Sequence, residues 1–394
     1  MSERSLGMPT RARWLLAVLP LGLVVGLVWF YLATDPLEPL GASAPPVEEL
    51  TVERSVIDDR GFHLHVRADG SEPMRIAQVQ VDGAYWEFDL EPAGALARLE
   101  SAWVHIPYPW VEGETHLVSL VTGSGLIFEH EIPVAIATPT FTLSRLLAFA
   151  LLGLYVGVVP VSLGLLFYPY LKTLGARGLQ FLLALTIGLL AFLLVDTLQE
   201  GLELAAAAAA AFQAQAVVWL AAALTFLGLL VAGRRSGQPR GAALAYFLAL
   251  GIGLHNLGEG LAIGAAFAVG EVALGSFLVI GFTLHNITEG IGIAAPLTQR
   301  RSAFWTFVGL AALAGLPAVL GTWFGAFAYA PQWAALFLGI GAGAILQVIV
   351  EVAAYLSSLA SQDERAGNWW SFTNLAGVAT GIVVMYLTAF LVSV

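Results

Sequence analysis

Residues 254–260 read Leu-His-Asn-Leu-Gly-Glu-Gly, and residues 284–290 read Leu-His-Asn-Ile-Thr-Glu-Gly. The two segments begin thirty residues apart and share His, Asn, Glu and Gly at equivalent positions. Each lies inside a long apolar run, where an ionisable side chain is costly to bury and is a functional candidate for that reason. On a helix, the His and the Glu four positions later share one face, with the Asn beside the His. The pair therefore predicts two membrane helices with matched polar groups.

These polar groups favour a metal site. The six candidate ligands are His255, Asn256, Glu259, His285, Asn286 and Glu289. Imidazole combined with carboxylate suits Zn²⁺, Fe²⁺, Mn²⁺ or Co²⁺ and is unusual for Ca²⁺ or Mg²⁺. Two neutral imidazoles and two carboxylates also balance a 2+ charge, which makes burial tolerable. The alternative, a neutral His–Glu packing pair on each helix, is disfavoured because the pattern occurs twice at matched depth. We therefore predict a divalent-metal site near the middle of a bilayer.

The composition is that of a polytopic membrane protein. Of the 394 residues, 58% are hydrophobic and only 11% are charged. The chain has no cysteine, which excludes disulfides, thiolate zinc sites and cysteine nucleophiles. The net charge of −11 is concentrated in residues 35–140, which hold 18 Asp and Glu against 5 Arg. An acidic extramembrane segment indicates cations as partners and argues against nucleic acid.

Changes in composition and in the spacing of apolar residues along the chain predict four regions. Residues 1–34 read as an N-terminal cytoplasmic tail and an anchor helix, because an apolar run of 20 residues is longer than the core of a cleaved signal peptide, the alternative reading. Residues 35–46 resemble a linker. Residues 47–138 alternate with a period near two between turn signals, which predicts a small extracytoplasmic β-sandwich domain. Residues 139–394 are predicted to form an eight-helix metal transporter domain.

Eight apolar spans define that last region. Their approximate ranges are 142–168, 178–203, 209–233, 241–268, 272–297, 302–328, 333–358 and 371–393. The fold class that we predict is a polytopic α-helical membrane protein, in which an eight-helix bundle is preceded by one anchor helix and a small all-β sandwich domain.

The basic residues predict the orientation. With a cytoplasmic N-terminus, eleven of the twelve Lys and Arg residues outside the β domain fall in inside segments, and only Arg145 lies on the other side. The β domain and the C-terminus are then extracytoplasmic. We expect a multi-pass protein of the cell membrane, that is, a plasma or inner membrane.

The two polar segments resemble the fourth and fifth helices of ZIP (Zrt/Irt-like) metal transporters. The resemblance covers about residues 142–394 and includes the eight-span count. It implies a first metal site at His255, Glu259, His285 and Glu289, and a second position that uses Asn256, Asn286 and the same glutamates. Family members with a binuclear centre add a Glu from the sixth span. Ala318 stands at that place here, which favours a mononuclear centre.

Further polar residues are candidates for the transport path. Asp196 and Glu200 lie four positions apart in the second span, near its outer half, where they are either an entrance relay or interfacial charges. Glu351, with Gln347 one turn deeper, lies in the inner half of the seventh span, where a release-side ligand is expected. In the β domain, His63 and His65 project from one face of a strand. They are either a capture site or ordinary surface histidines, and the sequence leaves both open.

Three function classes follow from these features. The first is a secondary transporter that moves a divalent transition metal toward the cytoplasm, with zinc favoured and iron, manganese or cadmium as alternatives, and with no cofactor. The second is an intramembrane zinc-dependent hydrolase, which needs an open metal position and a separate general base that the sequence does not offer. The third treats the β domain as a receptor module on a membrane anchor, for which eight spans are excessive. We also predict a homodimer, both from the family resemblance and from a face of small residues in the sixth span, namely Gly309, Gly315, Gly321 and Gly325.

Overall fold

The N-terminal part of the chain forms a unit of its own. The computed structural model describes residues 19–20, 22–30, 47–235, 237, 239–299, 301–360 and 371–392. Residues 19–20 and 22–30 of the predicted anchor are helical. The rest of the anchor, the N-terminal tail and the predicted linker lie outside the described residues. Residues 1–47 and 48–394 are separate compact units.

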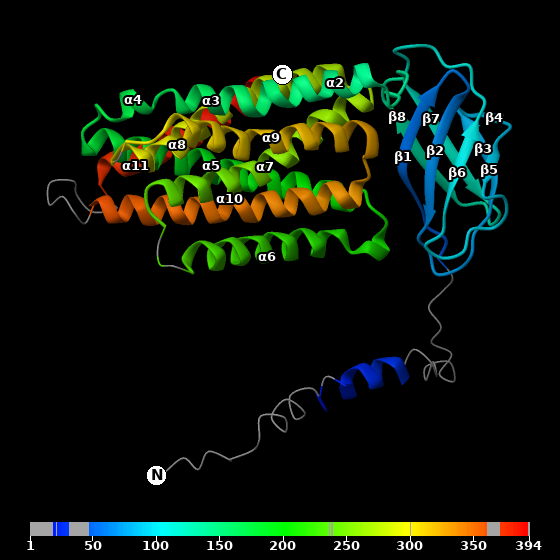
Figure 1. The fold of residues 1–394 in the computed structure, drawn as a ribbon. Coiled ribbons are helices and arrows are strands. Elements are labelled where there is room, and N and C mark those ends of the chain that lie inside the picture. Colours follow the sequence, from blue (N-terminus) through cyan, green and yellow to red (C-terminus); the bar gives the residue numbers. More distant parts are fainter. Residues whose placement is uncertain are drawn as a thin grey trace, which may run out of the picture. The chain divides into compact units, whose positions relative to one another are not determined.

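The second unit begins with a β domain of two antiparallel four-stranded sheets, drawn in blue and cyan in Figure 1. One sheet has the order β1-β2-β6-β5 and the other the order β4-β3-β7-β8. The strands are β1 (Leu50–Asp58), β2 (Gly61–Ala68), β3 (Ile76–Val81), β4 (Ala84–Trp86), β5 (Asp89–Glu91), β6 (Ser101–Ile106), β7 (His116–Thr122) and β8 (Ile127–Ile132). The expected β-sandwich fold is thus confirmed.

Period-two patterning builds the core of this domain. Along β6, Ala102, Val104 and Ile106 are buried, whereas the alternate residues Trp103 and His105 are only partly buried, because successive side chains of a strand point to opposite faces. Buried residues of both sheets pack into one cluster. The face of β2 and β6 that points away from this core is therefore the histidine-bearing one.

The helical part follows directly. Its elements are α2 (Leu143–Gly153), η2 (Leu154–Val158), α3 (Val159–Leu165), α4 (Tyr168–Leu171), α5 (Ala176–Ala206), η3 (Ala210–Phe212), α6 (Ala214–Arg234), α7 (Ala242–Ala268), α8 (Val272–Ala294), η4 (Ala295–Gln299), α9 (Phe304–Ala328), α10 (Pro331–Ala360) and α11 (Phe372–Val392). Within the described residues, eight helical stretches are long and apolar enough to cross a membrane, as the sequence predicts.

The depth of each helix in the bundle differs sharply. Of the 18-residue apolar stretch of α7, 72% is buried inside the protein. The corresponding value for the span that contains α6 is 17%. Figure 1 shows α6 at an edge of the helices, beside α10. The helix that carries the first polar segment is thus the one most shielded from lipid, which is where costly polar groups are expected.

Close packing of α7 on α9 depends on glycine. A Cβ atom at Gly260 of α7 would collide with the carbonyl oxygen of Ala318, and one at Gly325 of α9 would collide with the carbonyl oxygen of Leu261. Without side chains at these points the two backbones approach directly, as small residues allow in membrane helices. This contact holds the first polar segment rigidly against α9.

The β domain contacts the turn between α5 and α6. The buried carboxylate of Asp69 accepts hydrogen bonds from the backbone N–H groups of Ala210 and Ala211. The guanidinium of Arg67 lies 5.3 Å from the centre of the Phe212 ring, a cation–π distance. These contacts attach the β domain to η3, the turn between α5 and α6.

Candidate metal centre

Helices α7 and α8 bring three of the predicted ligands together. His255 and Glu259 of α7 and His285 of α8 each offer a ligand atom, and these atoms all lie within 4.8 Å of one another. Glu259 Oε1 lies 3.0 Å from His255 Nε2 and 2.5 Å from His285 Nε2. All three side chains are buried. Two imidazoles facing one carboxylate in a buried position match the donor set of a transition metal.

Glu289, the fourth predicted ligand, is not in that three-residue group but is equally buried. Its exposed fraction is 2%, and neither carboxylate oxygen has a hydrogen-bond partner among the described residues. An ionised carboxylate so placed is strongly unfavourable unless a cation balances it. Its placement on α8, one turn after His285, is therefore consistent with a role in the same metal chemistry.

Two asparagines connect the site to the neighbouring elements. Asn256 donates from Nδ2 to the carbonyl oxygen of Ala314 on α9, at 3.0 Å. Asn286 donates to the carbonyl oxygen of Val156 at 3.0 Å and to Glu259 Oε2 at 3.2 Å. Both Oδ1 atoms are buried without a hydrogen-bond partner among the described residues. Each amide thus fixes a helix contact with its nitrogen and keeps an oxygen available as a ligand.

The carbonyl oxygen of Val156, which accepts the hydrogen bond from Asn286, belongs to a π-helical turn. Residues Leu154–Val158 form η2 inside the first span, and Pro160 is the second residue of α3, which follows. π-Turns within helices occur often at functional sites, because the extra residue redirects backbone carbonyls. The sequence pattern did not predict η2 as part of the site; Pro160 was the only available signal, since proline removes a helical N–H.

A cavity of about 380 Å³ lies between α5, α8 and α11, and His285 of the candidate centre is part of its lining. Asp196, Glu200 and Glu203 of α5 line it, together with His285 and apolar residues of α8 and α11. The carboxylates are spaced by one turn or less along α5, so they form a stripe toward His285. The structure thus brings Asp196 and Glu200 into one cavity with a ligand of the metal centre.

Helix α10 carries the two other path candidates, and both are buried. A Cβ atom on Gly251, one turn before His255, would lie 3.4 Å from Gln347 Oε1, so Gln347 contacts α7. Glu351 forms an ion pair with Arg234 at the end of α6, with 3.1 Å between Arg234 Nε and Glu351 Oε1. Sequence reasoning did not predict this partner. Glu351 is therefore paired with an arginine here and is not part of the three-residue group at the metal centre.

Ala318 lies on α9, one turn after Ala314, and faces η2. It is fully buried, and a Cβ atom at Gly157 of η2 would lie 2.8 Å from the Ala318 Cβ. A methyl group occupies the place where a sixth-span carboxylate is expected in binuclear relatives. The described residues around Ala318 thus present no charged group from α9.

Comparison with known families agrees with this arrangement. The model of the ZIP zinc transporter family matches residues 232–389, which include every predicted ligand, Gln347 and Glu351. No curated protein matches the chain significantly. The matched family consists of zinc transporters, which favours transport over the hydrolase reading. With its eight membrane-capable helices, this chain is a multi-pass membrane protein whose residues 232–389 are similar to the ZIP family of zinc transporters.

Proposed function

We propose that this chain is a secondary transporter that moves a divalent transition metal, with zinc as the favoured cargo, toward the cytoplasm through a midplane site at His255, Glu259, His285 and Glu289. The observation that carries the proposal is the convergence of three buried ligand atoms from α7 and α8 within 4.8 Å. Imidazole and carboxylate donors favour zinc and its neighbours over calcium and magnesium. Asn256 and Asn286 hold the centre and supply further oxygen atoms.

The proposed path has an entrance and an exit. Asp196 and Glu200 attract cations into the cavity that ends at His285, because a stripe of carboxylates with apolar walls raises the local cation concentration. On the other side, Gln347 contacts α7 near His255, and Glu351 lies one turn further along α10. We assign Gln347 and Glu351 to release. The pair of Glu351 with Arg234 keeps that carboxylate neutralised between release events.

The direction follows from the orientation that the basic residues predict. Eleven of twelve basic residues outside the β domain fall in segments on the side of the N-terminus, which the positive-inside rule places in the cytoplasm. The acidic cavity then opens outside, on the side of the β domain. We place the protein in the plasma or inner membrane.

The proposed homodimer needs a different surface from the one that the glycines suggested. Three of these glycines, Gly315, Gly321 and Gly325, are buried. A Cβ atom at any of them would collide with the backbone of η2 or α7 in the same chain. The opposite side of α9 exposes Leu316, Leu320 and Phe324. We propose this apolar face as the dimer contact, and a monomer in native mass spectrometry from lipid-like detergent would contradict it.

Uptake by proteoliposomes tests the transport function. Purified protein is reconstituted, Zn²⁺, Fe²⁺, Mn²⁺ or Cd²⁺ is added outside, and metal-sensitive and pH-sensitive dyes inside record metal entry and any coupled proton. We expect zinc entry in the wild type and its loss, by at least about tenfold, in Glu259→Gln, because the amide removes a charge that faces both imidazoles.

Glu271→Gln is the matched control, because Glu271 precedes α8 outside the ligand group and undergoes the same chemical change. It should transport as the wild type does. Uptake at the wild-type rate in Glu259→Gln would contradict the assignment of the site. A wild-type protein that admits manganese or iron and excludes zinc would contradict the proposed cargo.

A further inference from the structure

The sheet β1-β2-β6-β5 carries a second group of histidines on the face turned away from its core. His63 of β2 lies between the core residues Phe62 and Leu64, and therefore projects from the opposite face. In the strand register, His63 pairs with His105 of β6, and His105 pairs with Asp89 of β5. Side chains directly opposite in adjacent strands share one face. Two imidazoles and a carboxylate thus form one row across three strands.

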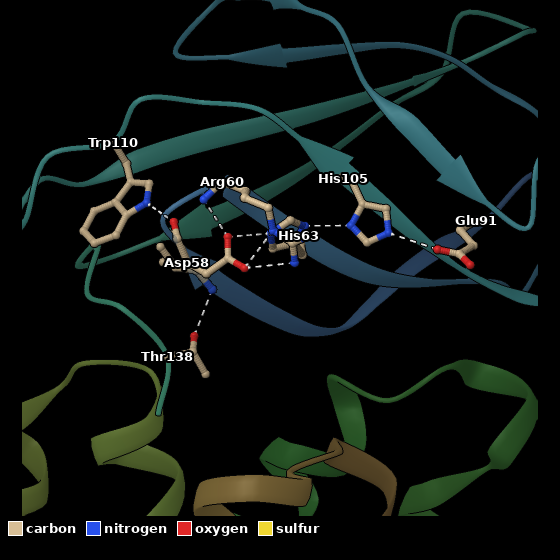
Figure 2. A network of polar contacts seen from close by, with 8 residues as sticks. Asp58, Arg60, His63, Glu91, His105, Trp110 and Thr138 are labelled. Atoms are coloured by element: carbon tan, nitrogen blue, oxygen red, sulfur yellow. Dashed lines mark hydrogen bonds and ion pairs between the residues drawn. The ribbon is translucent and has the colours of Figure 1, made fainter. Parts of the chain in front are cut away.

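The contacts within this group form a chain, shown in Figure 2. The Nδ1 atoms of His63 and His105 face each other at 2.7 Å. The other ring nitrogen of each histidine is directed toward a carboxylate: His63 Nε2 lies 2.8 Å from Asp58 Oδ1, and His105 Nε2 lies 3.7 Å from Glu91 Oε2. The order is therefore carboxylate, imidazole, imidazole, carboxylate.

In this row of four side chains, the nitrogen lone pairs of the two Nδ1 atoms face each other when both imidazoles are neutral. An ionised carboxylate only accepts hydrogen bonds, so Asp58 requires the hydrogen of His63 on Nε2, and Glu91 favours the same tautomer for His105. In neutral imidazoles with that tautomer, both Nδ1 atoms are acceptors. Two acceptors at 2.7 Å repel each other unless a cation lies between them.

We propose that His63 and His105 bind a divalent transition metal ion through their Nδ1 atoms, as a site in the β domain separate from the transport centre. Asp58 and Glu91 then hold the outer N–H groups, which is the arrangement that fixes the tautomer of metal-bound histidine. Nitrogen ligands of a tetrahedral ion at its usual bond length are roughly 3.3 Å apart, so the two rings need to separate by only about half an ångström. Water completes the coordination.

The surroundings suit a 2+ ion. Three carboxylates (Asp58, Asp89 and Glu91) surround the pair against one guanidinium, that of Arg60. Asp58 is fixed in place, because its Oδ1 accepts from the Arg60 backbone N–H at 2.8 Å and its carbonyl oxygen accepts from Trp110 Nε1 at 2.6 Å. The second ligand, His105, has a third of its side chain exposed, which gives the ion access from solvent.

A proton is the competing occupant of the same position. One proton shared between the two Nδ1 atoms makes the pair an imidazolium and removes the repulsion without any metal. The two possibilities give different results at neutral pH. A metal site binds zinc, whereas a pair that shares a proton does not.

Zinc binding by the full-length chain distinguishes them. All variants carry His255→Ala, Glu259→Gln and His285→Ala, which remove the three converging ligand groups of the transport centre, so that the result is independent of the proposed transport function. Zn²⁺ is titrated by calorimetry, and Co²⁺ replaces it for absorption spectra, which report tetrahedral nitrogen ligation. We expect about one ion per chain in this background and a loss of affinity of at least about tenfold, the effect expected for a removed ligand, in His63→Ala and in His105→Ala.

His65→Ala is the matched control. His65 lies two positions along β2 on the same face, but its Nδ1 lies 3.1 Å from Glu53 Oε2 instead of another histidine. It should bind zinc as the parent does. Thermal unfolding without metal checks the fold of each variant, and the more exposed His105 keeps the test valid if His63→Ala unfolds. Absence of zinc binding in the parent, or unchanged binding in His105→Ala, would overturn the proposal.

Discussion

At the scale of single residues, the candidate metal centre combines predicted ligand groups with groups that position them. Glu259 faces both imidazoles with one carboxylate oxygen, while its other oxygen accepts from Asn286. The two asparagines donate to backbone carbonyls on α9 and η2. Buried polar groups need partners in this way, because an unpaired one costs the desolvation energy of the group. The asparagines therefore serve the fold and the site together.

The residue at position 318 is expected to determine how many metal ions the candidate centre binds. A glutamate at this position restores the sixth-span carboxylate of binuclear relatives, next to the turns of α9 and η2 that bind the two asparagines. In Ala318→Glu we expect bound zinc at the transport centre to rise from about one toward two per protomer, since a second ion needs a further anionic ligand. Elemental analysis of purified protein provides the count.

The count is made in a His63→Ala, His105→Ala background, so that the β domain does not contribute. Ala318→Gln is the control for volume, because it adds a side chain of the same size without the charge, and it should leave one ion bound. Two tightly bound ions per transport centre in the chain with Ala318 intact would refute the mononuclear prediction.

At the scale of elements, the close packing of helices at glycines sets the position of the candidate ligands. Helices α7 and α9 meet at Gly260 and Gly325, where no Cβ atom fits. Membrane helices gain little from burying apolar surface against one another, because lipid is equally apolar, so close backbone packing supplies the attraction. The strength of the α7–α9 contact therefore depends on a few glycines.

Gly325→Ala tests this dependence. The new methyl group would collide with the carbonyl oxygen of Leu261, and relief requires α7 and α9 to separate. We expect a destabilisation of about 1–3 kcal/mol, the usual range for overpacking, seen as a lower midpoint of thermal unfolding in detergent. Gly228→Ala is the control, because nothing lies within 4 Å of a Cβ atom there. Equal midpoints for the two variants would show that the contact tolerates a side chain.

At the scale of the whole molecule, charge is distributed by region. The acidic residues between 35 and 140 and the basic residues of the inside segments occupy opposite ends of the predicted topology. On the β-domain side, the cavity with Asp196 and Glu200 continues this acidic character toward His285. The same asymmetry that orients the chain thus favours cations at the proposed entrance.

Cysteine labelling in a chain without natural cysteine tests the orientation. Ser71 and Thr173 are both exposed, the first in the β domain and the second between α4 and α5. In intact cells, a membrane-impermeant thiol reagent should label Ser71→Cys fully, whereas Thr173→Cys should react only after permeabilisation. The opposite pattern would reverse the topology and, with it, the proposed direction of transport.

Sequence patterns alone determined the main features of this protein. Apolar run length predicted the eight membrane-capable helices, and period-two alternation predicted the β domain. The repeated His-Asn-Glu-Gly pattern predicted the residues of which His255, Glu259 and His285 converge. These features are local: a helix or a strand is specified by the spacing of its own apolar residues. A costly polar residue in an apolar run also marks itself as functional.

Only the tertiary structure decided which groups face one another. The π-turn at η2, the pairing of Glu351 with Arg234 and the use of the α9 glycines inside the protomer were not predicted. The same holds for His63, which was considered with His65 on its own strand but meets His105 of β6 instead. Residues 42 positions apart become neighbours through strand register. Register is fixed by turns and by the shared core, which no local pattern specifies.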